Sequence, residues 1–213
     1  MDNEKADRTA ESYNKQAKMY EDKWEDYLSH THQKMLDIFT SGQEHRILDV
    51  SAGTGLMAHH LLKKDYDFSE LVLNDISEEM LNRAKKRFDE HEAVSFAEFP
   101  VEKLGFEDES FDTVISVNAF HNYTDQLLAL SEIHRLLKPG GKLYLLDWNK
   151  KGVFRLVNFC IDIFTNEVIQ TRSADEVKNA LGSVPFQVNV CEEWRYHYWN
   201  FFLMGAEKIK SPE

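Results

Sequence analysis

The stretch from Arg46 to Ala58 constrains the fold of this chain more than any other part of the sequence. It reads Arg-Ile-Leu-Asp-Val-Ser-Ala-Gly-Thr-Gly-Leu-Met-Ala, which predicts a strand over about 46–50, a turn of small residues and a helix over about 55–64. So apolar a strand is typical of a parallel sheet with helices on both faces. Gly53 and Gly55 let the backbone approach a ligand closely. The stretch therefore predicts a turn that binds a nucleotide-like cofactor.

The chain repeats this alternation of strand and helix as far as residue 148. Apolar runs predict further strands at 71–73, 94–97, 111–117 and 142–148. Ser77 caps one intervening helix and Thr124 or Asp125 caps another, which stops at Lys138-Pro139-Gly140-Gly141. This order is typical of an α/β protein with a parallel sheet covered on both faces.

In the last third of the chain the regular alternation of strand and helix ends. Residues 150–170 form an irregular, partly apolar segment, and Ser173 with Glu176 forms a capping box for a short helix that ends at Gly182. The strand-like runs 186–191 and 196–204 follow, joined by a link too short for a crossover, so we expect antiparallel neighbours. The second run is apolar or aromatic on both faces, which predicts a position inside the sheet.

The N-terminal region predicts a helix over about 10–39, preceded by a polar segment, 1–9, that we expect to be frayed. Aromatic and apolar residues, Tyr13 and Tyr20 among them, recur there at spacings of three or four until Ser41-Gly42. Two interpretations of this stripe stay open. It is either a packing face, or the face of a lid that folds over a pocket in the sheet.

Composition and charge narrow the classes of function. The chain has 25 Lys and Arg against 37 Asp and Glu, a formal charge of −12 that disfavours nucleic acid as a partner. No apolar run approaches the ~20 residues of a membrane span, and the charged N-terminus lacks a signal peptide's apolar core, so we expect a cytoplasmic protein. Cys160 and Cys191 have no ligand or redox spacing and are expected to be buried, reduced thiols. Adjacent His59 and His60 point in different directions, and no metal site is expected.

Asp49 decides between two cofactors for the glycine turn. Gly53 to Ala58 matches the dinucleotide pattern G-x-G-x-x-G/A, and Asp75 follows Gly55 at the spacing of a ribose-binding acid. A carboxylate at the end of the strand, however, would repel a pyrophosphate and attract a cationic cofactor. S-adenosylmethionine is cationic and has no phosphate. Asp75 is placed to accept hydrogen bonds from both of its ribose hydroxyls.

Four stretches, residues 47–55, 73–81, 110–116 and 136–143, resemble class I S-adenosylmethionine-dependent methyltransferases. The resemblance is to the small-molecule type related to the ubiquinone/menaquinone biosynthesis enzymes, and it covers about residues 10–148. It implies a Rossmann-like sheet of seven strands in the order 3-2-1-4-5-7-6, with strand 7 antiparallel. The family's first motif glycine is Ser51 here, which we expect to keep a negative φ. The acidic residue that usually contacts adenine in this family is replaced by Pro100 here. We therefore expect the backbone of Val101 and packing by Ile76 to recognise adenine.

The expected cofactor-binding residues are Asp49, Ser51, Gly53, Gly55, Asp75, Ile76, Val101, Asn118 and Tyr20. Methyl transfer from a sulfonium depends mainly on positioning, and a general base is needed only for some acceptors. His121, after the fourth strand, is the candidate base, with a structural role in its loop as the alternative. Asn118, Asp147 and Trp148 end neighbouring strands, and Asn118 contacts the cofactor or stabilises the loop.

The sequence thus predicts a single methyltransferase domain over 1–213, with residues 10–40 as a helical lid and 150–170 as an insert near the acceptor. An apolar or aromatic small molecule is the expected acceptor, since Phe154, Phe159 and Phe164 are candidates to line its pocket. A monomer or homodimer is expected. The alternatives are an NAD-dependent oxidoreductase and a binding or regulatory module without turnover.

Overall fold

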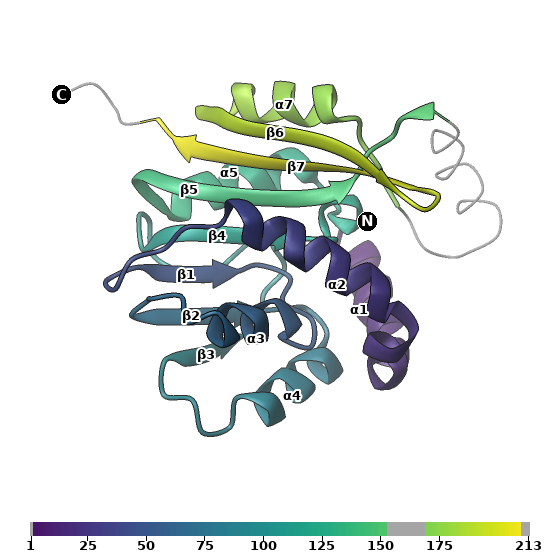
Figure 1. Cartoon of the computed structure of the whole chain (residues 1–213), viewed down its shortest axis with the longest axis vertical. Helices are drawn as coiled ribbons and strands as arrows, with labels where there is room; N and C mark the ends of the chain where they lie inside the picture. Colours follow the sequence, from purple (N-terminus) through teal and green to yellow (C-terminus); the bar gives the residue numbers. More distant parts are fainter. Residues whose placement is uncertain (1, 153–168, 210–213) are drawn as a thin grey trace.

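The computed structural model describes residues 2–152 and 169–209 and is built around one twisted sheet (Figure 1). Its seven strands lie in the order β3-β2-β1-β4-β5-β7-β6. β7 runs antiparallel to both of its neighbours, and the other pairs are parallel. This confirms the predicted topology. The strands are β1 (Arg46–Asp49), β2 (Glu70–Asn74), β3 (Val94–Ala97), β4 (Phe111–Val117), β5 (Leu137–Trp148), β6 (Phe186–Tyr196) and β7 (Trp199–Lys208).

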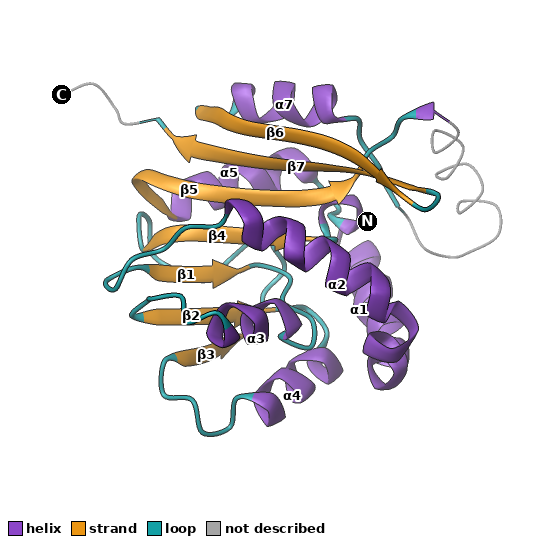
Figure 2. Cartoon of the chain, in the orientation of Figure 1, coloured by secondary structure: helices purple, strands orange, loops and turns teal. Residues whose placement is uncertain are grey.

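Helices cover both faces of the sheet (Figure 2). Residues of α2 and α3 pack on one face and residues of α5 and α7 on the other. The helices are α1 (Asp2–Gln16), α2 (Tyr20–Ile38), α3 (Leu56–Lys63), α4 (Glu78–Arg87), α5 (Gln126–Leu136) and α7 (Ala174–Ser183), with short 3-10 turns η1 (Ala17–Met19) and η2 (Phe120–Asn122). The predicted caps are confirmed: Ser77 caps α4, Asp125 caps α5, and Ser173 with Glu176 forms a capping box on α7.

The two cores explain why the strands are apolar without alternation. Leu48 packs in the core beneath α5 and α7, whereas its neighbour Ile47 packs in the core beneath α2 and α3. β7 behaves in the same way, with Phe202 on one side and Phe201 on the other, all four side chains being fully buried. A strand in the middle of such a sheet must bury both faces.

The N-terminal helix differs from the prediction of one helix over 10–39. It begins at Asp2 rather than after a frayed segment, and η1 divides it into α1 and α2. The break brings the rings of Tyr13 and Tyr20 to a centroid distance of 6.1 Å, although two turns of a continuous helix would separate such residues by about 10 Å along the axis. A second irregularity follows at Trp24, where φ is −116° and ψ is 16°.

Two further predictions are corrected. α5 ends at Leu136, as the stop signal predicts, but β5 begins at Leu137 rather than at Lys142: Leu137 pairs with Phe111, and the glycine turn is a bulge before Lys142 pairs with Thr113. Cys191 is exposed on β6 rather than buried. Cys160 and the three phenylalanines of the 150–170 segment lie outside the described residues.

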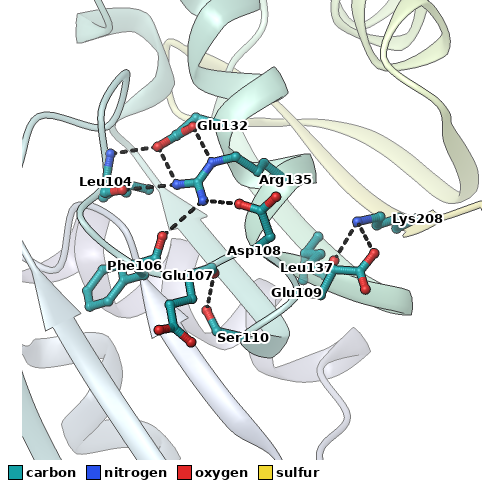
Figure 3. A network of polar contacts seen from close by, with 10 residues as sticks. All are labelled: Leu104, Phe106, Glu107, Asp108, Glu109, Ser110, Glu132, Arg135, Leu137 and Lys208. Atoms are coloured by element: carbon teal, nitrogen blue, oxygen red, sulfur yellow. Dashed lines mark hydrogen bonds and ion pairs between the residues drawn. The ribbon is translucent and has the colours of Figure 1, made fainter.

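Arg135 of α5 ties down the loop that precedes β4, at the amino end of that strand (Figure 3). Its guanidinium donates to the carbonyls of Leu104 and Phe106 and forms ion pairs with Asp108 and Glu132 at 2.6 and 2.7 Å. The planar fork of arginine satisfies several acceptors of one loop at once. This end of the sheet is therefore fixed, whereas the opposite end carries the clefts described below.

Gly55 begins α3 at a φ of 75°, and a Cβ there would lie 2.7 Å from the Phe88 ring. We therefore expect Gly55→Ala to lower the free energy of unfolding by about 2–4 kcal/mol, from left-handed strain plus overpacking. Urea unfolding without ligand measures this. Gly182→Ala is the matched control, because a Cβ meets nothing within 4 Å in that helix and helix propensity favours alanine. Equal stability of the two variants would contradict the packing argument.

Candidate active site

A cleft of about 700 Å3 opens at the carboxyl ends of β1, β2 and β4, which is where ligands bind in open α/β sheets. The turn after β1, the end of β2, the loop after β3 and the end of β4 line it, and α1 contributes Ala6, Thr9 and Tyr13. Seven of the nine predicted cofactor-binding residues line this cleft: Tyr20, Ser51, Gly53, Asp75, Ile76, Val101 and Asn118.

Gly53 and Gly55 have different surroundings. Gly53 has a φ of 55°, and a Cβ added there would meet nothing within 4 Å, so its backbone is open to the cleft. Gly55 does not line the cleft and instead packs against Leu73, Ala84 and Phe88. The turn thus uses one glycine for exposure of backbone to the cleft and the other for close helix packing.

Asp75 holds the glycine turn while facing the cleft. Its Oδ2 accepts the N–H of Gly53 and its Oδ1 accepts the N–H of Ser77, both at 2.8 Å. Burial raises the pKa of Asp75 to about 6 despite these bonds. A carboxylate oxygen accepts more than one hydrogen bond, so each oxygen keeps capacity for a ligand hydroxyl.

Asp49 is 3% exposed and does not line the cleft. Burial raises its pKa to about 7, although the N–H of Ser51 donates to the carboxylate. Within 2–152 and 169–209, neither Asp49 nor Asp75 forms an ion pair with a lysine or arginine. Two unpaired carboxylates next to one cleft favour a cationic, hydroxyl-bearing ligand and disfavour an anion.

The other end of the cleft has mainly apolar walls. Ile76, Met80, Pro100 and Val101 line it. Glu102, which the sequence interpretation missed, also lines it and accepts the N–H of Thr124 at 2.7 Å through Oε1. The sequence signal that could have identified Glu102 is the presence of an acidic residue two positions after Pro100, where the family's usual acid is missing. Such walls suit a flat ring system, with Glu102 as a nearby acceptor.

Ser51 keeps a negative φ, as expected, because it is absent from the left-handed residues of the chain. Its hydroxyl lies 3.2 Å from that of Tyr123, which also contacts Ser116 at 2.8 Å. These bonds fix the turn after β1 against the end of β4. Tyr123 is a second residue of the cleft that local sequence pattern did not reveal.

Helix α1 closes the cleft from the N-terminal side. Asn14 Oδ1 accepts the Ser77 hydroxyl at 2.6 Å, and the Tyr13 hydroxyl accepts Asn122 Nδ2 at 2.9 Å. Arg87 pairs with Glu21 at the start of α2 at 2.7 Å. Polar contacts of Asn14 and Tyr13 thus connect α1 to residues on two sides of the cleft.

A second pocket, of about 510 Å3, adjoins the first and shares four residues with it. The shared residues are Tyr13, Tyr20, Asn118 and Asn122. The rest of its lining is mostly aromatic and comprises Gln16, Trp24, Tyr27, His121, Trp148 and Ile169. No Lys, Arg, Asp or Glu is among these described lining residues, so the pocket suits an uncharged or aromatic molecule.

His121 and Asp147 form a buried pair at this second pocket, with 4% and 1% exposure. His121 Nδ1 lies 2.6 Å from Asp147 Oδ1, and the His121 N–H donates to Oδ2 at 2.8 Å. Because a carboxylate only accepts, Nδ1 donates to Asp147, so in the neutral imidazole Nε2 is the nitrogen with the lone pair. The ring stacks on Trp148 at 4.0 Å and 7°, which fixes its plane.

Tyr27 connects helix α2 to both pockets. Its hydroxyl donates to Asn118 Oδ1 at 2.8 Å and accepts Trp148 Nε1 at 2.7 Å. Asn118, at a φ of 57°, also donates to the Thr31 hydroxyl at 2.9 Å. The amide of Asn118 is thus held by α2 while its residue lines both pockets.

Two proteins of related sequence are each named ubiquinone/menaquinone biosynthesis C-methyltransferase UbiE. That of Cupriavidus necator is 31% identical over 78% of this chain and 70% of its own length, and that of Laribacter hongkongensis is 35% identical over 74% and 69%. The chain belongs to the UbiE-type family of S-adenosylmethionine-dependent methyltransferases. A family model described as a methyltransferase domain also matches residues 48–145.

Solved structures of other methyltransferases share the fold. An S-adenosylmethionine-dependent methyltransferase from Mesorhizobium loti superposes with a TM-score of 0.71 at 19% identity, over 82% of this chain and 96% of its own. The putative methyltransferase partner of the Haloferax volcanii Trm112 activator gives 0.78 at 20%, over 92% and 97%. At such identities the likeness shows the fold alone.

Membership in the UbiE-type family makes S-adenosylmethionine the cofactor and a small molecule the substrate. It also favours the methyltransferase prediction over the nicotinamide alternative. The unpaired carboxylates fit a cationic cofactor on grounds independent of the family. None of the helices in the described ranges is long and apolar enough to cross a membrane, and no group of three potential metal ligands occurs there.

The raised pKa of Asp49 predicts a pH-dependent stability. The folded protein binds this proton more tightly than the unfolded chain, so ionisation of Asp49 lowers stability progressively as the pH rises from about 4 through 7. We expect Asp49→Asn to be more stable than the wild type by about 2 kcal/mol at pH 8, and the difference to vanish near pH 4. Unfolding in urea across this range measures it. Asp67→Asn, at an exposed site, is the control, and an equal pH dependence in both variants would contradict the assignment.

Proposed function

We propose that this UbiE-type methyltransferase methylates an apolar or aromatic small molecule bound in the second pocket, by in-line displacement, with His121 as general base. The observation that carries the proposal is the adjacency of two pockets. One is lined by Asp75, with Asp49 buried next to it, and the other has aromatic walls and a histidine–aspartate pair. Methyl transfer needs two reactants held in line in a dry site. Four shared lining residues are consistent with that arrangement.

The first cleft is proposed to bind the cofactor. Asp75 would accept the ribose hydroxyls, while Ile76 and Val101 would pack on adenine. Ser51, Gly53, Tyr20 and Asn118 would surround the methionine part, with Asp49 and Gly55 supporting the turn from behind. S-adenosylmethionine supplies the electrophilic methyl group when bound, and the charge of the two carboxylates favours its cationic form.

His121 is proposed to remove the acceptor's proton. Nε2 has the free lone pair, and Asp147 stabilises the imidazolium that forms when Nε2 takes a proton. The related proteins are named as C-methyltransferases, and carbon is a poor nucleophile unless a neighbouring hydroxyl is deprotonated. A hydroxylated aromatic ring is therefore the acceptor that the pocket and the pair suit best. Asp147 acts in this scheme as a positioning residue.

Helices α1 and α2 are proposed to act as a lid over both pockets, within a single domain that spans the chain as a monomer or homodimer. The polar contacts that Asn14 and Tyr13 make to Ser77 and Asn122, at the edges of the first cleft, support this role. The alternative of a binding or regulatory module without turnover predicts that the protein binds the cofactor but transfers no methyl group. A screen of aromatic acceptors with radiolabelled cofactor, beginning with 1,4-naphthoquinol, tests this. Isothermal titration with NADH and, separately, with S-adenosylhomocysteine tests the alternative of a nicotinamide oxidoreductase. Tight binding of NADH with no binding of S-adenosylhomocysteine would support that alternative.

Asp75→Ala is expected to weaken binding of S-adenosylhomocysteine about tenfold or more, because charge-assisted hydrogen bonds to the ribose are lost. Isothermal titration calorimetry measures the change. Asp89→Ala, at an exposed position beyond α4, removes the same charge away from the cleft and should bind as the wild type does. Unchanged affinity in Asp75→Ala would refute the ribose assignment.

His121→Asn is expected to lower turnover by about a hundredfold at saturating cofactor while S-adenosylhomocysteine affinity stays within about twofold. Methyl transfer from radiolabelled cofactor to the best acceptor of the screen measures turnover. Asp147→Asn should also lower kcat, by a smaller factor, with the KM for the cofactor unchanged. The exposed His59→Asn is the matched control. Full turnover in His121→Asn would leave this histidine a structural role only.

A further inference from the structure

A third hollow, which we call the outer groove, lies between the start of α2 and the turn that joins β6 to β7. It is lined by residues 22–27 and 196–199 and encloses about 670 Å3. Trp24 and Tyr27 belong both to this groove and to the second pocket, so they form the wall between the two. The proposed function uses no other residue of the groove.

The apolar lining of the outer groove is aromatic. Tyr198 is 68% exposed at the β6–β7 turn, and its ring lies 4.9 Å from that of Trp199. Trp24 contacts Trp199 at 6.3 Å from the opposite side, and Tyr196 is half-buried next to them. A solvent-exposed tyrosine in a hollow of other rings offers π-faces to a ligand.

The charged lining of the outer groove is predominantly acidic. Asp22, Glu25 and Asp26 are all exposed there, against the single Lys23. Lys23 Nζ lies 4.9 Å from the centre of the Trp24 ring. One ammonium group of the chain itself therefore already occupies a π-face of this groove. The distance is within the range of a cation–π interaction.

We propose that the outer groove binds an organic cation of the alkylammonium type. Aromatic faces attract such a cation through their quadrupole, and the three carboxylates add a field of the matching sign. The same carboxylates disfavour phosphates, carboxylates and nucleic acid. The formal charge of −12 on the whole chain adds to the attraction at long range.

This site goes beyond methyl transfer, since the second pocket has no charged residue among its described lining and the groove lies on the far side of Trp24 and Tyr27. The groove provides a recognition element for a cationic group, whether on a free metabolite or on the outer end of an acceptor. Its occupancy is tested by direct binding, so the result does not depend on whether His121 is the base.

Choline and its neutral isostere 3,3-dimethylbutan-1-ol are the probes, titrated into the full chain and followed by NMR of the tryptophan indole N–H signals. We expect choline to bind about tenfold tighter than the alcohol and to weaken as salt is raised. Glu25→Gln with Asp26→Asn should weaken choline several-fold. Asp37→Asn with Glu44→Gln, which removes the same charge from exposed positions outside the groove, should not.

Two further variants test the aromatic part. Tyr198→Ser removes an exposed ring and should weaken choline at least threefold, whereas Lys23→Met removes the competing ammonium and should strengthen it. Circular dichroism and S-adenosylhomocysteine affinity check that each variant folds. Equal binding of choline and the alcohol, absence of binding by both, or an unchanged affinity in the Glu25–Asp26 double variant would each overturn the proposal.

Discussion

The bond from the Gly53 N–H to the Asp75 carboxylate, 2.8 Å long, is the interaction on which the rest of the site depends. It joins the turn after β1 to the end of β2, and the Ala52 N–H reinforces it by donating to the Asn74 carbonyl. The chain thereby holds a half-buried carboxylate without a cation beside it, which costs stability. A cationic ligand in the cleft would offset this cost, so the contact that shapes the turn also supports the proposed cofactor site.

The sheet could be predicted from the sequence because its determinants are local. Each strand is an apolar run between polar turns, as burial on both faces of a parallel sheet requires. The N-terminal helix could not be predicted so well. A stripe of aromatic residues satisfies the same spacing whether it packs on one surface or two, and only the meeting of Tyr13 and Tyr20 reveals the break at η1. The early start of β5 was missed because its glycine bulge resembles a helix stop.

The residues of the candidate site likewise differ in how well the sequence predicted their proximity. Gly53 and Asp75 belong to one local motif, and spacing alone predicted their proximity. His121 and Asp147 come from separate elements, and only the pairing of β4 with β5 brings the loop after one strand to the end of the other. The role of Gly55 is likewise tertiary, since its close neighbour Phe88 comes from the end of another helix. Sequence pattern finds the residues of one turn, and the fold decides which distant groups they meet.

Residues of helix α2 line the first cleft, the second pocket and the outer groove, and so connect the three. Tyr27 both donates to Asn118 and accepts from Trp148, so its hydroxyl is satisfied only when the two strand ends and the helix are all in place. Trp148 in turn stacks on His121 and on Trp199, at 4.0 and 4.8 Å. A shift of α2 would therefore disturb the Asn118 amide, which lines both pockets, and the Trp148 ring that stacks on His121. It would also move Trp24, which lines both the second pocket and the outer groove.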